Sequence, residues 1–381
     1  MTLDVLLKDS NISPMHNRLL NTISQPALLS YILPILMIYL VIGTIAQKYI
    51  GLYESTQIFF SSFILWAGPI PLPGLPIFLG FIFINLMCKL IFKSPWILKN
   101  AGIIITHIGA IFLLFGGFLT ASFSHEGYID LSEGEQKSFV SDYHIREFVI
   151  INEAQEVIHT FSHAALSKGM VLEIPNVDGL KLEVLEVCRH CEIKKRRFAQ
   201  DNYYGMAQHM QLDAAPLRTS DEENMSGLTF AIQGSETDGV YLSLENVPKF
   251  PQVEIDGKFY DFILRRQQRS LPFTVELLEF KRDMHPGTRL AKSYSSRVRI
   301  IDGDAQWESL IQMNEPLRYK GYSLFQSSFI STPAGDVSVL ASVNNAGRSF
   351  PYISGIAMCL GIILHLFMSR RRPHRTRRET S

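Results

Sequence analysis

The sequence predicts a membrane protein with four transmembrane helices and a large extracytoplasmic, β-rich, sandwich-like domain between helices three and four. The first observation is that 47% of the 381 residues are hydrophobic and that these residues gather at the two ends of the chain. A helix that crosses a bilayer needs about 20 apolar residues, and four runs approach or exceed this length. The second observation is that 124–351 contains no such run, carries frequent charges and shows strand-like alternation.

Composition excludes several classes of protein. Lysine plus arginine and aspartate plus glutamate each number 36, so the formal net charge is zero and bulk charge gives no reason to expect a nucleic-acid partner. Four cysteines are too few for a disulfide scaffold. The apolar runs make the lipid bilayer itself the first expected partner.

The chain begins with a polar segment, 1–26, which lacks the small-residue cleavage pattern of a secretory signal and is expected to form a cytoplasmic tail. Transmembrane helix 1 is predicted at 27–46. Pro34 lies inside this helix, and a membrane helix tolerates an internal proline better than a soluble helix does.

An extracytoplasmic loop is predicted at 47–74. Its apolar run at 58–66 is too short to span a bilayer, and the prolines that follow it stop a helix. We therefore expect 55–70 to lie at the membrane interface, with Trp66 as its aromatic anchor.

The remaining segments are predicted as transmembrane helix 2 at 75–92, a cytoplasmic loop at 93–100, transmembrane helix 3 at 101–123, the extracytoplasmic domain at 124–351, transmembrane helix 4 at 352–368 and a basic cytoplasmic tail at 369–381. Alternation is clearest at 181–187, 273–280, 297–301 and 337–343. A faint internal repeat superposes Glu186 on Glu279. We expect these two β units to stack face to face in a sandwich.

Basic residues predict the orientation of the chain. They cluster at three places, and four crossings put all three on one side of the membrane: Lys8 and Arg18 before the first span, Lys89, Lys93 and Lys99 around the loop between spans two and three, and the arginines after span four. The positive-inside rule makes that side cytoplasmic. The chain is therefore expected in the cytoplasmic (inner) membrane, with both termini inside and the large domain outside, where disulfides are permitted.

His107 is the one ionisable side chain in the third predicted span. An imidazole in hydrocarbon leaves both ring nitrogens seeking partners, so such a histidine usually faces a bundle interior or a cofactor. A neutral histidine that is bonded to a neighbouring helix explains the residue equally well. Gly109, Gly116 and Gly117 on the same helix would let another helix or a flat ligand approach closely.

His365 in the fourth predicted span is expected at nearly the same depth as His107. His107 is about 10 Å from the cytoplasmic end of its span, and His365 is about 7 to 8 Å from the cytoplasmic end of its own. Two imidazoles in one layer suit axial ligation of a planar metallocofactor or a proton relay. An interfacial side chain without a task is the other interpretation of His365.

Cys188 and Cys191 have the C-x-x-C spacing, but Glu192 stands where a haem attachment motif requires histidine. Residues three apart in a straight strand face opposite sides, so a bridge between these cysteines needs a turn at 189–190. Three interpretations remain open. The pair is a structural disulfide or two free thiols, or it exchanges disulfides with a partner, or it binds a metal together with His190.

Two further patterns in the outer domain predict solvated surface. His159 and His163 have i, i+4 spacing, but no third ligand type lies close by in the sequence, so a metal site is the weaker interpretation. The basic run 194–197 is a solvated face, which an anionic group such as a propionate or a lipid headgroup could use.

Five stretches match the pattern of one known family: GTIAQ at 43–47, the span around His107 and Gly109, HPGTRLAKSYSSRVRI at 285–300, NEPLRYKGYSLFQSSF at 314–329 and the entry into the last span at 347–352. With three spans, an outer domain and a fourth span in this order, the chain resembles the ResB-like family, subunits of the System II cytochrome c haem lyase. It departs from the family at Ala46, where proline is frequent, and 140–260 match weakly.

The resemblance implies a function. With a CcsA-like (ResC-like) multispan partner, such a subunit moves haem b, as a transported substrate, across the membrane and supports its attachment to apocytochrome c, whose C-x-x-C-H thiols add across the haem vinyl groups. His107 matches the family's third-span haem ligand and His365 is the matching candidate in the last span. The ligands of the outer attachment site belong to the partner. The chain would thus be a haem lyase (holocytochrome c synthase) component that is catalytic only with its partner, without catalytic residues of its own.

Two other classes of function remain. One is a non-catalytic membrane-anchored scaffold that docks apocytochrome c or a thioredoxin-like thiol reductant, with both membrane histidines structural. The other is a transporter or ion-coupled subunit that uses the histidine layer as a proton relay, although four spans with few other intramembrane charges argue against it.

Overall fold

The computed structural model describes residues 14–175, 179–198, 201–247, 249–288, 291–333 and 335–370. Lys8 and the basic tail from 371 onward, which entered the prediction of orientation, lie outside the described residues. The chain divides into two compact units. The helical unit comprises Met1–Gln47, Glu54–His125 and Asn344–Ser381, and the β unit comprises Lys48–Tyr53 and Glu126–Val343.

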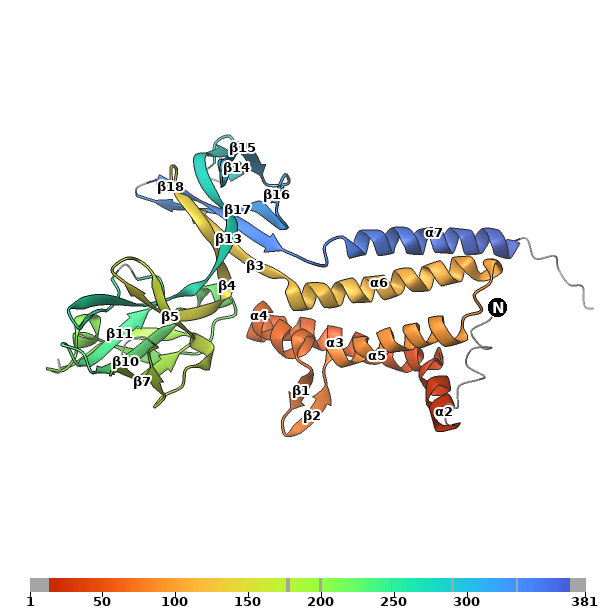
Figure 1. Cartoon of the computed structure of the whole chain (residues 1–381), viewed down its shortest axis with the longest axis horizontal. Coiled ribbons are helices and arrows are strands. Elements are labelled where there is room, and N and C mark those ends of the chain that lie inside the picture. Colours follow the sequence, from red (N-terminus) through yellow and green to blue (C-terminus); the bar gives the residue numbers. More distant parts are fainter. Residues whose placement is uncertain are drawn as a thin grey trace, which may run out of the picture. The chain divides into compact units, whose positions relative to one another are not determined.

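The helices are α2 (Pro14–Ile23), α3 (Ala27–Ile50), α4 (Leu52–Ser55) with its continuation η1 (Thr56–Ser61), α5 (Leu75–Cys88) with its continuation η2 (Lys89–Lys93), the turn η3 (Leu98–Asn100), α6 (Ala101–Phe123) and α7 (Phe350–Arg370) (Figure 1). A two-stranded hairpin, β1 (Ile64–Ala67) and β2 (Ile70–Pro73), lies between η1 and α5.

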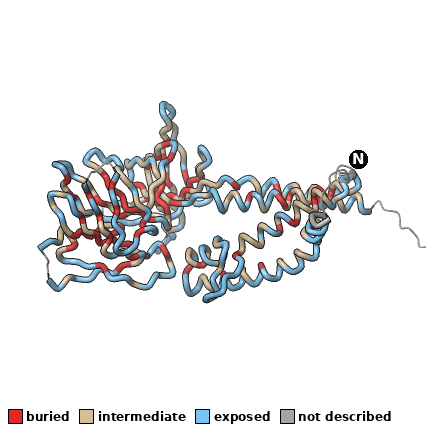
Figure 2. The backbone as a smooth tube through the Cα atoms, turned by 60° about the horizontal axis from the view of Figure 1, so that its bottom comes forward, coloured by how far each residue is buried: buried red, intermediate tan, exposed pale blue. Residues whose placement is uncertain are grey.

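Four helices among the described residues are long and apolar enough to cross a membrane: Ala27–Ile50, Leu75–Lys93, Leu98–Phe123 and Phe350–Ser369. This confirms the predicted fold class of four apolar helices with a β-rich domain between the third and the fourth. Figure 2 shows that the helices bury few residues, whereas buried residues are dense in the strands. Largely uncovered apolar helices are what a lipid environment requires.

Helices α6 and α7 pack closely because glycines line their contact. A Cβ atom on Gly109 would lie 2.7 Å from Met358 Cγ and 3.0 Å from the Ser354 carbonyl oxygen. On the facing helix, a Cβ atom on Gly361 would lie 2.7 Å from the Thr106 backbone nitrogen. Small residues let two membrane helices approach to backbone contact, so this pair forms one rigid element.

The larger strands of the β unit are β3 (His125–Leu131), β4 (Gln136–Asn152), β5 (Val157–Ser162), β7 (Lys181–Cys188), β10 (Gly227–Gln233), β11 (Gly239–Leu244), β13 (Lys258–Met284), β14 (Ala291–Asp302), β15 (Ala305–Gln312), β17 (Tyr322–Thr332) and β18 (Gly335–Asn344). Short strands are β6 (Val171–Glu173), β8 (Cys191–Lys195), β9 (Met210–Ala214), β12 (Gln252–Ile255) and β16 (Leu317–Tyr319). One sheet has the order β11-β10-β7-β6, and the largest has the order β15-β14-β13-β4-β3-β18-β17-β16 with β5 and β12 beside it.

Two large hydrophobic cores lie among the described residues of the β unit. In the first lobe the four-stranded sheet packs on β4, β12 and β13 through a core that includes Phe148, Phe230 and Phe262. In the second lobe the far ends of the same long strands close with β14, β15, β17 and β18 around a core that includes Leu277 and Leu340. Strands β4 and β13 run through both lobes, so they join the two cores covalently (Figure 1).

The sandwich of the first lobe agrees with the predicted architecture, but the predicted pairing of the internal repeat is wrong. Glu186 belongs to β7 in the first lobe, whereas Glu279 lies at the end of β13 that pairs with β14 in the second lobe. The sheet that covers β7 is instead built from β4, β12 and the first half of β13. The two stretches have similar local alternation, but they form strands that belong to different hydrophobic cores.

Candidate functional site: a membrane histidine and a buried ion network

His107 lies in α6 with a fixed tautomer. Its Nδ1 atom is 2.9 Å from the carbonyl oxygen of Ile103, one turn earlier in the helix. A carbonyl oxygen can only accept, so Nδ1 carries the proton and donates it. The lone pair then resides on Nε2, the atom through which a neutral imidazole ligates iron, and the Nδ1 hydrogen bond holds the ring in place.

The His107 ring leaves α6 on a flank between its two helical neighbours. Gly102 and Gly109 mark the side that contacts α7, and Ile104 and Ile111 pack with α5 residues on another side. At about 100° per residue, His107 is about 140° around the helix from Gly102. It therefore points away from α7, along a partly exposed strip of α6.

His365 is placed differently. The backbone of His365 lies directly against Gly102. A Cβ atom on Gly102 would also lie 2.6 Å from the Gly361 carbonyl oxygen. His365 is thus level with Gly102, and His107 lies five residues further along α6, which corresponds to about 7 to 8 Å along the helix axis. The predicted common layer of the two histidines is therefore wrong, because α7 is shifted along α6 by about 4 to 5 Å, nearly one helical turn, from the alignment assumed.

This arrangement limits what the two imidazoles can do together. Axial ligands approach an iron porphyrin from opposite faces, and the glycine contact between α6 and α7 leaves no space for a macrocycle. His107 also lies about 140° around α6 from Gly102, against which the His365 backbone lies. Within this chain, each histidine can offer one nitrogen to a metallocofactor, but the two do not converge on a single iron.

Cys188 and Cys191 form a disulfide with a Cα–Cα distance of 5.6 Å. Residues 189–190 make the required turn between β7 and β8, as the spacing predicted. The two cysteines are 9% and 1% exposed and pack with Leu212 and Leu244 in a small core of their own. Burial of both sulfurs favours the structural interpretation over exchange with a thioredoxin-like reductant, because a thiolate must reach a sulfur to attack it.

The other predicted surface features are only partly solvated. His163 follows β5 in a short turn, is 4% exposed and lies 3.4 Å through Nε2 from the Gly227 carbonyl oxygen; burial lowers its pKa. In the basic run, the Lys194 ammonium pairs with Asp213, and the Arg196 guanidinium lies 4.3 Å from the centre of the Tyr203 ring. His163 is therefore a core residue. Two of the four residues of the basic run, Lys194 and Arg196, interact with other side chains of the β unit.

A buried network of ion pairs lies in the β unit, and sequence reasoning missed it. Two arginines and two carboxylates compensate one another. The Arg146 guanidinium lies 2.9 Å from Asp221 Oδ2 and 3.2 Å from Glu245 Oε2. Arg266 Nε lies 2.8 Å from Glu245 Oε1. All four side chains are less than one tenth exposed, so the cluster is nearly dry and electrically neutral.

The network extends to His144 at its edge. His144 Nδ1 is 2.8 Å from Asp221 Oδ2, and the His144 ring stacks on Tyr53 with a centroid distance of 4.0 Å. Burial opposes ionisation of Asp221, but hydrogen bonds from His144 and Arg146 outweigh it and hold the pKa of this carboxyl well below its usual range. These residues come from four distant parts of the chain, so no local spacing could have revealed them.

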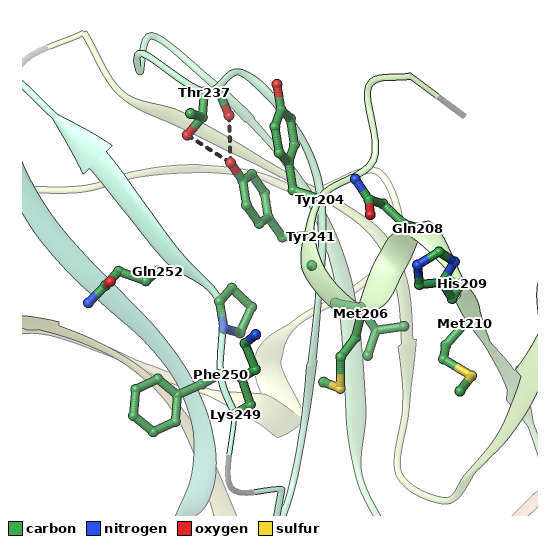
Figure 3. A pocket seen from close by; sticks show the side chains of 13 residues that line it. Tyr204, Met206, Gln208, His209, Met210, Thr237, Tyr241, Lys249, Phe250 and Gln252 are labelled. Atoms are coloured by element: carbon green, nitrogen blue, oxygen red, sulfur yellow. Dashed lines mark hydrogen bonds between the residues drawn. The ribbon is translucent and has the colours of Figure 1, made fainter. Parts of the chain in front are cut away.

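The β unit also contains a cavity of about 650 Å³ beside β11 and η5 (Gly205–Gln208). Figure 3 shows Tyr204 and Tyr241 side by side at its wall, with the Tyr241 hydroxyl bonded to Thr237. The two rings stack with a centroid distance of 5.2 Å. None of the residues predicted as a site lines this cavity, and the sequence offers no motif there.

Comparison with known proteins gives a match in the β unit. A family model described as the ResB-like family matches residues 251–346, which comprise β12 to β18. Protein NrfI of Wolinella succinogenes is 29% identical to this chain over 114 residues, and the match covers 29% of this chain and 12% of NrfI. The chain therefore aligns with a small part of that protein's length.

The matched segment includes two of the motifs that carried the sequence resemblance, 285–300 and 314–329. In the structure these motifs form β14 and the hairpin from β16 to β17 in the second lobe. The resemblance of this chain to the ResB-like family is therefore confirmed within residues 251–346.

Proposed function

We propose that this chain is a membrane subunit of cytochrome c biogenesis that holds haem b at His107 while haem crosses the membrane. The ResB-like match supports the biological process, and the geometry of His107 supports the role of that residue. The observation that carries the proposal is the hydrogen bond from His107 Nδ1 to the Ile103 carbonyl oxygen, 2.9 Å long. In the neutral ring this bond places the lone pair on Nε2, the atom that can bind iron.

The proposed complex contains a CcsA-like multispan protein as the partner of this chain. His107 faces outward from its own helix pair, so a haem bound there lies between α6 and whatever packs on that flank. Its second axial ligand then comes from outside the α6–α7 pair. His365 lies on α7 where its backbone contacts Gly102. We propose that it has a secondary role at the cytoplasmic end of the path that haem takes across the membrane.

The complex would deliver reduced haem to apocytochrome c outside the cytoplasm. There each client thiol adds its sulfur and hydrogen across one haem vinyl group, which forms a thioether without net oxidation. This chain supplies no group that reacts in this step, so it is a haem lyase component that is catalytic only with its partner. The buried disulfide in the β unit supports an extracytoplasmic location, since cytosolic thiols are kept reduced.

The test is haem content after histidine replacement. The full chain is co-expressed with its CcsA-like partner and a C-x-x-C-H reporter in a host without its own assembly system. His107→Ala should remove most of the Soret absorbance of the purified complex and the haem-stained reporter, and added imidazole should restore part of the reporter signal. His365→Ala is the matched control and should retain most of the bound haem. An unchanged Soret band in His107→Ala would refute the role of His107.

A scaffold function is the second candidate, and one observation favours it. The matched family segment, 251–346, lies wholly in the β unit apart from its last residues, and it does not include His107. A scaffold would dock apocytochrome c through the second lobe while both membrane histidines remain structural. The same experiment separates the two candidates, because a scaffold with His107→Ala keeps its haem content and loses reporter maturation only when the second lobe is altered.

A further inference from the structure

The hairpin β1–β2 of the helical unit presents an apolar surface that the described residues of the chain leave uncovered. No charged residue occurs anywhere from 55 to 88. Phe63, Ile64, Trp66 and Ile70 are 66%, 48%, 64% and 59% exposed. A two-stranded ribbon by itself cannot bury such side chains, so something outside the described chain must cover them.

The base of the hairpin is attached halfway along α3. The Tyr39 hydroxyl donates to the Pro73 carbonyl oxygen at 2.7 Å, and the Tyr39 ring meets Phe78 of α5 at a centroid distance of 5.5 Å. Tyr39 is the thirteenth residue of α3, which starts at Ala27. This position is about 18 Å along the helix axis, in a bilayer whose hydrocarbon core is about 30 Å thick.

Helix α5 gives the same depth independently. Leu75 starts the helix directly after the hairpin, and Lys89 is its first charged residue. The distance between them along the axis is about 21 Å, which again leaves the hairpin base about 10 Å inside the outer boundary of the core. The hairpin is thus deeper than the interface expected for 55–70, and Figure 1 shows it projecting sideways from α3 and α5.

The chain reaches this depth because it turns back after α3. Ser55 Oγ donates to the Gly43 carbonyl oxygen at 2.6 Å, and a Cβ atom on Gly43 would meet the Phe60 ring and lie 3.1 Å from Phe59 Cβ. Helix α4 and η1 therefore run back along α3 toward the middle of the membrane. The segment is re-entrant and ends in β structure.

On the open edges of the hairpin, most outward positions either lack a backbone N–H group or have their backbone groups hydrogen-bonded to nearby residues. The strands pair Leu65 with Leu72 and Trp66 with Pro71. Proline cannot donate, so Pro71 and Pro73 occupy the outward positions of β2, and this edge has no N–H group at all. On β1, Ser62 Oγ donates to the Ile64 carbonyl oxygen at 2.6 Å and lies 3.2 Å from its N–H.

Three backbone groups remain without a recorded partner on these edges: the N–H and C=O of Trp66 and the C=O of Pro71. Hydrocarbon cannot satisfy them, and each such group costs several kcal/mol in lipid, so open sheet edges do not face lipid. We propose that the hairpin is the docking element for transmembrane helices of a second, multispan protein, whose hydroxyl or indole groups bond to Trp66 and Pro71. This inference rests on the proposed function for the identity of that partner, the CcsA-like protein.

Two features favour a different protein over lipid or a second copy of this chain. Helices α3 and α5, which meet at the base of the hairpin, also carry exposed apolar residues, such as Ile38 and Phe81, so helices lying along these spans would meet the hairpin as well. Self-pairing of two hairpins would need donors at outward positions; of the two outward N–H groups, that of Ile64 is already bonded to Ser62 Oγ, which leaves that of Trp66.

Photo-crosslinking in membranes tests the inference. A photoreactive amino acid replaces Trp66 or, in a second variant, Leu72 in the full chain, which is co-expressed with the CcsA-like protein, each with its own tag. The expected result is a light-dependent adduct that carries both tags. An adduct with lipid only, or between two copies of this chain, would overturn the proposal.

A second measurement uses matched tryptophan replacements. Trp66→Ala should lower the amount of CcsA-like protein that copurifies by about tenfold or more, because buried tryptophans commonly anchor interfaces. Trp96→Ala, at an equally exposed tryptophan near α6, should leave it unchanged. Equal recovery of the partner with both variants would contradict a docking role of the hairpin.

The Soret band of each preparation keeps this inference separate from the proposed function. Normal haem content without a crosslink, together with equal partner recovery, would overturn the hairpin interface alone. A crosslink to the CcsA-like protein with no His107-dependent haem would overturn the proposed haem site and leave the interface in place.

Discussion

Single buried charged residues in the β unit contribute strongly to the free energy of unfolding. Asp221 is about one twentieth exposed, and the His144 and Arg146 side chains bond to it. Removing one member of a buried ion pair leaves the others uncompensated, which commonly costs about 3 to 5 kcal/mol. We expect Asp221→Asn to lower the free energy of unfolding by about this amount at pH 7, whereas Asp304→Asn at an exposed position should change it little.

The pH dependence of this effect has a definite sign. The folded state depresses the pKa of Asp221 below its ordinary value of 3.8. A depressed carboxyl pKa stabilises the fold above the unfolded pKa, and this contribution is lost as the pH falls below that value toward the folded pKa. The stability gap between wild type and Asp221→Asn, measured by thermal unfolding, should therefore be constant from pH 7 to about pH 5 and shrink below about pH 4. A gap that stays constant to pH 3 would show that the ionised carboxylate is not responsible.

The disulfide is predicted to act on stability rather than on redox chemistry. Replacing Cys188 and Cys191 together by alanine opens a very short loop, and the loss of loop constraint corresponds to about 2 kcal/mol. We expect a lower unfolding temperature with unchanged reporter maturation at low temperature. Loss of maturation with unchanged unfolding temperature would instead indicate disulfide exchange with a partner.

At the scale of elements, the glycine contact between α6 and α7 can be tested with a matched pair. Gly102→Ala places a Cβ against the backbone of α7, 2.6 Å from the Gly361 carbonyl oxygen, and backbone atoms cannot move aside singly. Gly117→Ala on the same helix meets nothing within 4 Å. Thermal unfolding of the full chain in detergent should therefore show a clear loss of stability for Gly102→Ala and none for Gly117→Ala. Equal stability of the two variants would mean that the helix contact is looser than described.

The sequence predicted elements well where a single periodicity decides them. The apolar runs located α3, α5, α6 and α7, with α7 starting at Phe350 rather than 352. The strand predicted at 273–280 is only part of β13, a 27-residue strand whose pairing with β4 shifts register between Ser270 and Val275. The hairpin β1–β2 was missed because Pro71 and Pro73, interpreted as helix stops, also suit outward positions of a ribbon.

The candidate site was predictable only in part, for a physical reason. An imidazole within an apolar run is unusual in itself, so His107 could be singled out from local sequence. Its relation to His365 depends on how far α7 slides along α6, which the glycine contacts decide and residue counting cannot. The network of Arg146, Asp221 and Glu245 arises from tertiary folding alone, since its members are 75 and 99 residues from Arg146.

At the scale of the whole molecule, we propose from the four apolar helices and the charge pattern that the β unit lies outside the cytoplasm. Lys89, Lys93 and Lys99 around the short connection before α6 support this orientation through the positive-inside rule. Arg18, which precedes the first apolar helix, is predicted on the same side. An odd number of crossings before the β unit, with one after it, is the arrangement that this pattern requires.

Thiol labelling in intact cells tests that orientation. In a background with Cys88 and Cys359 replaced by serine, Ser132→Cys in the β unit should react with a membrane-impermeant maleimide, because its side chain is exposed. Lys99→Cys, exposed between α5 and α6, should react only after the membrane is permeabilised. Cys188 and Cys191 are joined and give no background. Labelling of Lys99→Cys from outside, with protection of Ser132→Cys, would reverse the topology and place the β unit with its disulfide in the cytoplasm, where an oxidised cysteine pair would not be accounted for.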